Sequence, residues 1–446
     1  MELQTAPGLA WTLSNLSAVH YFGHITGVKG LTVEVCAPAA VRTMGQQATI
    51  LADSSRAAEV VGFDQERALM MVFGRYEGLG VGQRVLFEKN APCIFPTLQW
   101  LGRIVDARGE PLDGKGPLAH GNRAYSLNSL PPSAIRRPRV GGKIDLGVRA
   151  INTFLSCCAG QRMGIFAGSG VGKSVLLAMI TRFTQLEAIV IGLVGERSRE
   201  VQEFLQEHLG EEGLRRSIVV VASSGEPALM RRQAAYLTLT LAEFLADQGK
   251  QVLCLMDSVT RFAMALREIG LSAGEPPTTK GYPPSVFAEL ARLLERAGPR
   301  PRQGSITGLF TVLVEGDDYN EPIADAVRSI LDGHIVLERK IAEQGRFPAI
   351  NILRSVSRTL PHCNTEKENA LVTRARYLLS IYEDMEELIR LGAYKKGSDP
   401  QVEEAIFYHE ALSIFLSQRL EEPSCLREGY YQLERLLSAR PQESTV

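Results

Sequence analysis

The sequence lacks the features that would direct it to a membrane, an oxidising compartment or a nucleic acid. No apolar run among its 446 residues reaches the roughly 20 residues of a membrane-spanning helix, and no basic segment followed by an apolar one opens the chain. The seven cysteines are scattered, without paired Cys-x-x-Cys spacing, which is typical of reduced thiols in a cytosol. The formal net charge of -1 argues against a surface dominated by phosphate contacts. We expect a cytoplasmic globular protein whose membrane association comes through partners or an amphipathic surface.

One stretch that is present, residues 162–177, has the pattern of a phosphate-binding loop between a strand and a helix. Its glycines allow a tight turn whose N–H groups face anionic oxygens at a helix N-terminus. We expect Lys173 to reach the β- and γ-phosphates of a nucleotide and the Ser174 hydroxyl to bind Mg²⁺. Ala167 stands where the strict pattern has glycine, and the alternative is a glycine-rich turn that binds nothing. The predicted nucleotide-binding residues are Gly168, Ser169, Gly170, Val171, Gly172, Lys173, Ser174 and Val175.

Nucleotide hydrolysis also needs a carboxylate that holds the metal and a group that positions water. Asp257 follows the apolar run 252–256, so its carboxylate would emerge near the phosphate loop and hold Mg²⁺ through water; the alternative is the N-cap of the next helix. Glu196 follows another apolar run and is the candidate for orienting the attacking water; the alternative is a solvated loop with an internal salt bridge. The neighbouring Glu200 is expected to lie one helical turn further along the chain, with its side chain pointing away from the site.

The order of sequence patterns predicts three parts after a loosely helical arm or frayed terminus at residues 1–19. Short β-branched runs broken by glycine predict a small β-barrel within residues 20–95. Alternating apolar strands and helices predict an α/β core with a largely parallel sheet within residues 96–362. Apolar residues three and four apart predict a helical domain over residues 363–446.

These predictions rest on the following expected strands and helices. The expected strands of the barrel are 27–35, 47–51, 68–73 and 84–87, and those of the core are 188–194, 218–222, 252–256, 310–314 and 335–337, with a helix over 227–247. Proline and glycine punctuate residues 107–146, which we expect to be loop and linker. Its basic cluster Arg136, Arg137 and Arg139 is interpreted as solvated.

Several segments resemble the type III secretion export ATPases, relatives of the catalytic subunits of rotary F- and V-type ATPases. They are Ala-Gly-Ser-Gly-Val-Gly-Lys-Ser (167–174), Gly-Glu-Arg-Ser-Arg-Glu-Val (195–201), Met-Asp-Ser-Val-Thr-Arg-Phe-Ala (256–263), Gly-Glu-Pro-Pro-Thr-Thr-Lys-Gly-Tyr-Pro-Pro-Ser-Val-Phe (274–287), Val-Glu-Gly-Asp-Asp-Tyr-Asn-Glu-Pro-Ile-Ala-Asp (314–325) and Ile-Leu-Asp-Gly-His-Ile-Val-Leu (330–337). The flagellar members look closest, because of Cys157-Cys158 and Met-Glu-Glu-Leu-Ile-Arg-Leu-Gly-Ala-Tyr (385–394). The resemblance runs from roughly residue 20 to the C-terminus.

The resemblance implies a RecA-like P-loop ATPase core with a small N-terminal β-barrel and a C-terminal helical domain, assembled as a homohexamer with ATP at subunit interfaces. By the same resemblance Glu196 is the catalytic glutamate, Arg197 an arginine near the γ-phosphate, and Arg358 an arginine finger supplied in trans. Phe347 falls where the family usually stacks a tyrosine on adenine, and an aromatic face is retained. Asn351 stands where the family commonly has aspartate, which removes a charge near the finger segment.

The activity implied is Mg²⁺-dependent ATP hydrolysis that energises flagellar protein export at the cytoplasmic face of the inner membrane. Implied partners are the export apparatus, a stalk-like central subunit, a regulatory peripheral subunit, and export chaperones and cargo. A virulence injectisome ATPase is the nearest alternative. A RecA-like hexameric RNA or DNA translocase is another, although the barrel sequence has no interleaved aromatic and basic face, so no nucleic acid is expected. A non-hydrolysing nucleotide-binding subunit is the third, and Glu196 argues against it.

Overall fold

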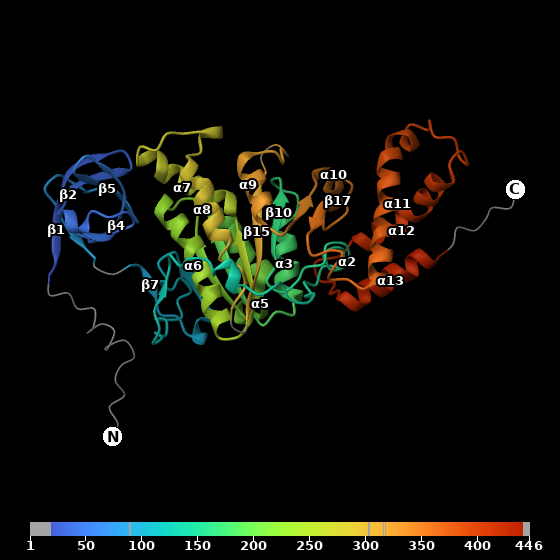
Figure 1. The fold of residues 1–446 in the computed structure, drawn as a ribbon, viewed down its shortest axis with the longest axis horizontal. Helices are drawn as coiled ribbons and strands as arrows, with labels where there is room; N and C mark the ends of the chain where they lie inside the picture. The colour runs from blue at the N-terminus through green and yellow to red at the C-terminus, as the bar shows by residue number, and fades with distance from the viewer. Residues whose placement is uncertain (1–18, 89–90, 302–303, 315, 317, 440–446) are drawn as a thin grey trace, which may run out of the picture.

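The computed structural model describes residues 19–88, 91–301, 304–314, 316 and 318–439, and its three parts lie in a row (Figure 1). A β-barrel lies at one end, an α/β core in the middle and a group of helices at the other end. This arrangement confirms the predicted fold class. The predicted N-terminal arm lies outside the described residues apart from Val19, and the domain boundaries stay predictions.

The N-terminal part is a closed barrel with the strand order β1-β2-β5-β4-β3-β6. Its strands are β1 (Tyr21–Lys29), β2 (Thr32–Cys36), β3 (Gln47–Leu51), β4 (Arg56–Asp64), β5 (Arg67–Val72) and β6 (Arg84–Phe87), with a 3-10 turn η1 (Ala39–Val41). The run 27–35 was wrong as a single strand, because the chain turns at Gly30, whose φ is +56°, between β1 and β2. Strand β4 was not predicted, because its alanines and Glu59 weaken the alternation expected of a strand.

The core is a sheet with the order β17-β16-β10-β15-β13-β11-β12-β8, and β14 pairs with β15. The strands are β8 (Ile104–Asp106), β10 (Arg162–Ala167), β11 (Ala188–Val194), β12 (Ser217–Ala222), β13 (Gln251–Asp257), β14 (Gly298–Pro299), β15 (Ser305–Leu313), β16 (Gly333–Leu337) and β17 (Ile350–Ser357). The expected core strands are confirmed, and the sheet is largely parallel, with antiparallel pairs at β14 and β17. Edge strand β8 was not predicted. A small separate pair is formed by β7 (Cys93–Ile94) and β9 (Tyr125–Ser126).

Helices cover both faces of the sheet, which explains why its strands are apolar throughout. Alternate residues of β11 show this division: Val190 packs into one core cluster with α6, whereas Ile189 and Ile191 pack into another with α3. The helices of the core are α2 (Arg149–Phe154), α3 (Lys173–Phe183), α4 (Ser198–Glu203), a π-helical turn η4 (Phe204–Leu209), α5 (Gly210–Arg215), α6 (Ala228–Asp247), α7 (Val259–Ser272), α8 (Pro284–Leu294), α9 (Pro322–Ile330) and α10 (Arg339–Glu343). Short 3-10 turns are η2 (Leu98–Trp100), η3 (Ala134–Arg136) and η5 (Thr279–Gly281). No helix in the described ranges is long and apolar enough to cross a membrane.

Both end parts are fixed to the core by contacts of buried groups. In the barrel, Glu59 of β4 pairs with Arg232 of α6 at 2.5 Å. At the other end lie α11 (Glu366–Arg390), α12 (Pro400–Leu416) and α13 (Leu426–Ser438), whose apolar faces continue the core cluster of α2 and α3. Arg149 of α2 donates to the Phe415 carbonyl oxygen at 3.2 Å. The C-terminal helices therefore belong to one continuous hydrophobic core with the sheet.

The segment 107–146 is mostly irregular, as predicted, but its basic cluster is not uniformly solvated. Arg136 and Arg139 are exposed, whereas Arg137 is half-buried and donates to the Ala297 carbonyl oxygen at 3.2 Å. Its guanidinium also pairs with the Glu295 carboxylate at 3.3 Å. The interpretation of Arg137 as a solvated linker residue was wrong, because its partners are 158 and more residues away and sequence spacing does not reveal them.

Candidate nucleotide-binding and catalytic site

The phosphate-loop sequence forms the predicted turn between β10 and α3. Strand β10 ends at Ala167, which is buried and pairs with Leu313 and Leu337 of the neighbouring strands, so a methyl group is accommodated there. Helix α3 begins at Lys173, and Gly172 caps it with φ +94° and ψ 19°, a left-handed conformation that favours glycine. The first N–H groups of α3 are thereby presented to an anion.

A cavity of about 970 Å³ opens beside this turn. Seven of the predicted nucleotide-binding residues line it, namely Gly168, Ser169, Gly170, Gly172, Lys173, Ser174 and Val175. Val171 does not line it, because its side chain is buried in the core beneath the loop. The size is that of a pocket for a nucleotide-sized ligand.

Lys173 lies between two carboxylates at the carboxyl ends of the strands. Its Nζ atom is 2.5 Å from Asp257 Oδ1 and 3.3 Å from Glu196 Oε1. Asp257 is further fixed by the buried Thr311 hydroxyl of β15, which donates to its Oδ1 at 2.7 Å. Asp257 is not the cap of the next helix, since Ser258 caps α7 by accepting from the Arg261 N–H. Thr311 was not among the sequence candidates, because only the pairing of β13 with β15 brings it to Asp257.

Glu196 is held in place by the backbone that precedes it. Gly195 has φ +72°, and a Cβ there would lie 2.6 Å from Cβ of Arg261, so a side chain at this position would collide with α7. The Glu196 carbonyl oxygen accepts from the Ser224 N–H at 2.9 Å. Only 8 % of the Glu196 surface is exposed, and its carboxylate faces the cavity.

Burial and charge set the protonation of this cluster. Burial raises the pKa of Glu196 to about 7, and the charge of Asp257 acts in the same direction, while Lys173 opposes both. Burial alone would lower the pKa of Lys173, but Asp257 and Glu196 more than offset it and the net shift is upward. The expectation that Glu200 points elsewhere was wrong: it lines the same cavity, and its hydrogen bond with Glu196 contributes to raising the pKa of Glu196.

Cations from several elements surround the cavity. Arg197, predicted near the γ-phosphate, lines it with a side chain that is 78 % exposed. Further cations that sequence reasoning did not single out are Arg261, Arg267, Lys280 and Arg339. Arg339 of α10 donates to the Ser169 carbonyl oxygen at 3.0 Å and so supports the loop. A concave site rich in cations suits a polyphosphate.

Phe347 lies beside the phosphate loop. A Cβ on Gly172 would be 3.5 Å from its Cδ1, and 44 % of its surface is exposed, so a ring face is open to a ligand. Nearby, Asn351 donates to Glu338 Oε2 at 2.5 Å, and Glu338 pairs with Arg354 at 3.5 Å. An aspartate in place of Asn351 would face the Glu338 carboxylate, so the amide is the matching residue here.

Arg358 is the predicted site residue that the fold separates from the others. Strand β17 runs antiparallel to β16, and Ser357 pairs with Gly333, so Arg358 lies where β10 begins, whereas the phosphate loop lies where β10 ends. Six residues of strand at ~3.3 Å each separate these ends by roughly 20 Å. Arg358 is exposed, and its N–H donates to the Asp332 carbonyl oxygen at 2.9 Å.

The residues present fit Mg²⁺. Ser174 at the start of α3 and the Asp257 carboxylate at the end of β13 both supply oxygen, the ligand that this ion prefers. Both lie at the same edge of the sheet as Lys173, where phosphate oxygens would complete the coordination.

Three family descriptions match successive parts of the chain. Residues 25–89 match the beta-barrel domain of the ATP synthase alpha/beta family, and residues 147–357 match its nucleotide-binding domain. Residues 364–435 match the T3SS EscN ATPase C-terminal domain.

Similar proteins extend over nearly the whole chain. A flagellum-specific ATP synthase of Caulobacter vibrioides is 55% identical over 426 residues, which are 94% of this chain and 96% of that protein. The flagellum-specific ATP synthase of Bacillus subtilis is 48% identical, with 93% and 95% covered. Among solved structures, the assembled ATPase EscN of the enteropathogenic E. coli type III secretion system is 40% identical with a TM-score of 0.88, covering 93% of this chain and all of that one. EscN in complex with its central stalk EscO gives a TM-score of 0.85 at the same identity and coverage.

Proposed function

Because the chain belongs to the ATP synthase alpha/beta family and carries a C-terminal domain of the type III secretion ATPases, we propose that it is a Mg²⁺-dependent ATPase that energises flagellar protein export. The observation that carries the proposal is the meeting of Glu196 and Asp257 at Lys173 of the phosphate loop. A subunit that only bound nucleotide would need the loop and the metal carboxylate, but no second buried carboxylate at the cavity. We therefore infer that the chain hydrolyses ATP and is not a subunit that only binds nucleotide.

Each residue has a distinct part in hydrolysis. The N–H groups at the start of α3 and the Lys173 ammonium bind the phosphates, and the Phe347 ring stacks on the adenine. Ser174 and Asp257 would hold Mg²⁺, which would supply positive charge to neutralise the phosphates. The Glu196 carboxylate accepts a hydrogen bond from the attacking water and orients it. Arg197, at the rim, lies near the γ-phosphate.

Assembly into a homohexamer completes the site. Within a single chain, Arg358 and the phosphate loop lie at opposite ends of a strand, roughly 20 Å apart. We therefore assign this arginine to the site of a neighbour. The relative EscN is known in an assembled form and in complex with a central stalk, which supports assembly around a stalk here. We assign the ring to the cytoplasmic face of the inner membrane, with a peripheral regulatory subunit, chaperones and cargo as further partners.

The flagellar system is favoured over an injectisome by identity, because the chain is 55% identical to a flagellar relative and 40% identical to EscN. The decisive cellular test replaces the gene in its host by a Glu196→Gln version and measures flagellar proteins in the culture medium. Loss of their secretion, with normal export restored by the unmodified gene, is expected. Normal secretion with the variant would contradict the proposal.

The biochemical test measures ATP hydrolysis against protein concentration, with and without Mg²⁺, while light scattering follows particle size. Specific activity that rises as hexamers form, and only with Mg²⁺, is expected. Full activity in a species that stays monomeric at every concentration would exclude the shared site, although not ATP hydrolysis itself.

A further inference from the structure

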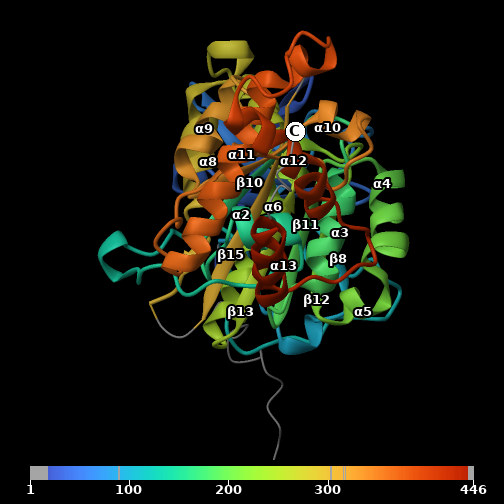
Figure 2. The same ribbon diagram turned by 90° about the vertical axis from the view of Figure 1, so that its right-hand side faces the viewer.

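A loop of residues 130–140, here called the arginine loop, stands out from the side of the core (Figure 2, left). At its tip Ile135 is 97% exposed, and Leu130 is 74% exposed. Arg136 and Arg139 beside them are exposed as well, and the loop contains no acidic residue. Two aliphatic side chains that are largely exposed to solvent, next to two exposed cations, are unusual for a free surface and indicate a docking element.

The arginine loop is held in position rather than trailing in solvent. Arg137 pairs with Glu295 at the end of α8 and donates to the Ala297 carbonyl oxygen. Its guanidinium packs directly on Gly298, where a Cβ would lie 2.9 Å from Nη1. Prolines 131, 132 and 138 restrict the backbone of the loop further. A pre-organised loop loses little entropy when it binds.

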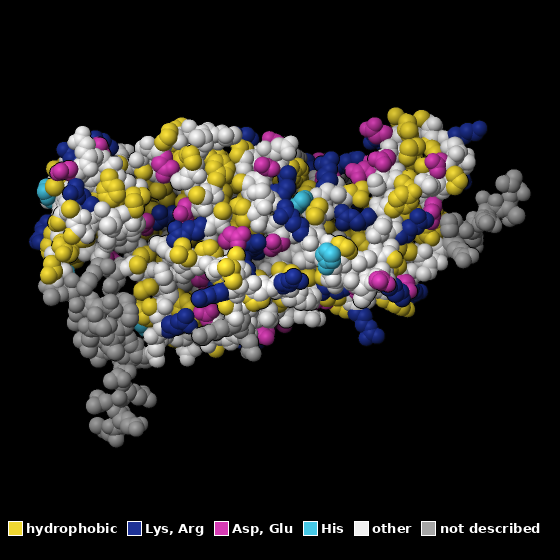
Figure 3. Space-filling view, viewed as in Figure 1, with side chains coloured by type: hydrophobic (Ala, Val, Ile, Leu, Met, Phe, Trp, Pro, Cys, Tyr) yellow, Lys and Arg dark blue, Asp and Glu magenta, His cyan; other side chains and the backbone are white. Residues whose placement is uncertain are grey.

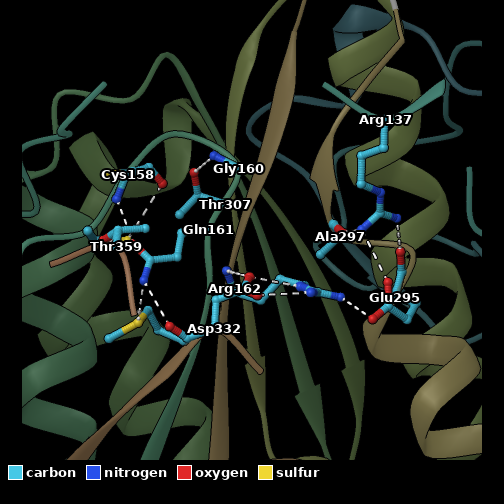
Figure 4. Close-up of polar contacts among 12 residues, drawn as sticks. Arg137, Cys158, Gly160, Gln161, Arg162, Glu295, Ala297, Thr307, Asp332 and Thr359 are labelled. Atoms are coloured by element: carbon cyan, nitrogen blue, oxygen red, sulfur yellow. Dashed lines mark hydrogen bonds and ion pairs between the residues drawn. The ribbon is translucent and has the colours of Figure 1, made fainter. Parts of the chain in front are cut away.

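The contacts that anchor the loop continue from Glu295 through Arg162 to Asp332 (Figure 4). Glu295 also binds Arg162 at 2.5 Å, and Arg162 binds the Asp332 carboxylate at 3.0 Å. The Asp332 carbonyl oxygen in turn accepts the Arg358 N–H. The loop and Arg358 are thus fixed to one network, and a neighbour that receives Arg358 meets the loop on the same side.

The opposite side of the core carries the complementary charge. The segment 198–215, here called the acidic helices, comprises α4, η4 and α5 and lies on the far side of the core from the loop (Figure 2, right). Its exposed glutamates are Glu200, Glu203, Glu207, Glu211 and Glu212, against two exposed arginines, Arg199 and Arg215. Glu200 and Glu203 also line the nucleotide cavity. In contrast, several Lys and Arg side chains gather over the core on the face seen in Figure 3, among scattered acidic ones.

We propose that the arginine loop of one copy docks on the acidic helices of the next copy in the ring. This inference rests on the proposed assembly and names the surfaces that form it. A ring needs a head-to-tail contact between two different surfaces of the same chain, and these two lie on opposite sides with opposite charge. Because the acidic helices border the nucleotide cavity, the same contact brings the Arg358 side of one copy towards the site of the next.

The test exchanges the charges. The double variant Arg136→Glu/Arg139→Glu is compared with Glu211→Arg/Glu212→Arg by light scattering. Each alone is expected to need at least about tenfold more protein to assemble than the wild type, because like charges then face each other. Mixed in equal amounts, the two are expected to assemble alternately, since every contact in the mixed ring again joins opposite charges. Assembly of the mixture also shows that neither variant is misfolded.

Two further variants separate a local contact from a general effect of charge or exposure. Lys395→Glu/Lys396→Glu makes the same charge change at exposed positions beyond α11 and is expected to assemble like the wild type. Ile135→Asp is expected to weaken assembly, while Leu391→Asp, which alters a side chain 75% exposed, is not.

The outcomes distinguish the two proposals. A wild-type chain that never assembles would overturn the proposed ring. A wild type that assembles, together with loop variants that assemble equally well, would overturn only the docking of the loop. Weak assembly of each variant without rescue in the mixture would mean that the loop meets a surface other than the acidic helices, which also overturns the inference.

Discussion

The Nζ atom of Lys173 lies 2.5 Å from Oδ1 of Asp257, so the cation assigned to phosphate is bound by the carboxylate assigned to the metal. Both side chains are about nine-tenths buried, and an unpaired charge would be costly there. Phosphate and Mg²⁺ would replace this pair by two new pairs of opposite charge. In the absence of nucleotide, this ion pair holds the Lys173 and Asp257 side chains in position.

Glu196→Gln is expected to retain ATP binding and to lower turnover by about 10²–10⁴-fold, because the neutral amide oxygen accepts the water's hydrogen bond more weakly than a carboxylate and cannot take up its proton. Binding is measured with a fluorescent ATP analogue and turnover by phosphate release. Equal turnover in both proteins would remove Glu196 from the mechanism.

Arg358→Ala is expected to lower hydrolysis by about 10³-fold or more in assembled rings, because the neighbour's γ-phosphate loses its cation. Rings mixed from Arg358→Ala and Glu196→Gln chains should regain part of the activity. Some interfaces then join an intact Glu196 to an intact Arg358. If the mixture stays as inactive as its components, Arg358 does not act in trans.

Phe347→Ala is expected to raise the KM for ATP by about three- to tenfold with little change in kcat, because only ring stacking is lost. Phe347→Tyr keeps the ring and serves as the matched control. A fall in kcat with KM unchanged would assign Phe347 a different part.

Low pH is expected to reduce the stability that the loop after β8 gives to the fold. The Arg103 guanidinium, 2.7 Å from Asp113, holds the pKa of that carboxyl well below its usual range, with backbone N–H groups of Ile104 and Lys115 contributing. A lowered pKa stabilises the fold at pH values above the unfolded pKa near ~4 and loses this effect as pH falls below it. The difference in melting temperature between wild type and Asp113→Asn should therefore shrink from pH 7 to pH 3. A constant difference would contradict this coupling.

Arg296→Met is expected to destabilise the core by about 3–5 kcal/mol, because it leaves the buried Glu243 carboxylate with only the more distant Arg300, 3.8 Å away, to balance its charge. Arg296 is 1% exposed, and its Nη2 lies 2.9 Å from Glu243 Oε2. The double variant Arg296→Met/Glu243→Leu should recover much of the loss in denaturant unfolding. Equal losses in both would show that the charge of Glu243 is not the cause.

The sequence predicted those parts of the site that depend on local order. Gly172 and Lys173 follow one another in a turn whose geometry comes from the backbone alone. Asp257 ends one buried parallel strand, and Glu196 follows shortly after the end of another. Since the carboxyl ends of parallel strands meet at one edge, their meeting follows from the pattern.

Other parts depend on which strands pair and could not be predicted. Thr311 reaches Asp257 only because β15 lies next to β13, and Arg137 reaches Glu295 across 158 residues. Glu200 lines the cavity from helix α4, which begins at Ser198 shortly after β11 ends at Val194, and spacing alone does not fix this boundary. The position of Arg358 required the antiparallel direction of β17, which is an exception in an otherwise parallel pattern.

Within one chain, Arg358 and Glu196 lie at opposite ends of the strands of one sheet. If Arg358 serves the site of a neighbour, as we propose, every chain carries one half of each of two different sites, and a newly made chain would be nearly idle until neighbours join it. Copies could therefore accumulate before a ring forms without consuming much ATP. In the same way, one defective copy would silence a site that its healthy neighbour also needs, and such a mutation would be dominant.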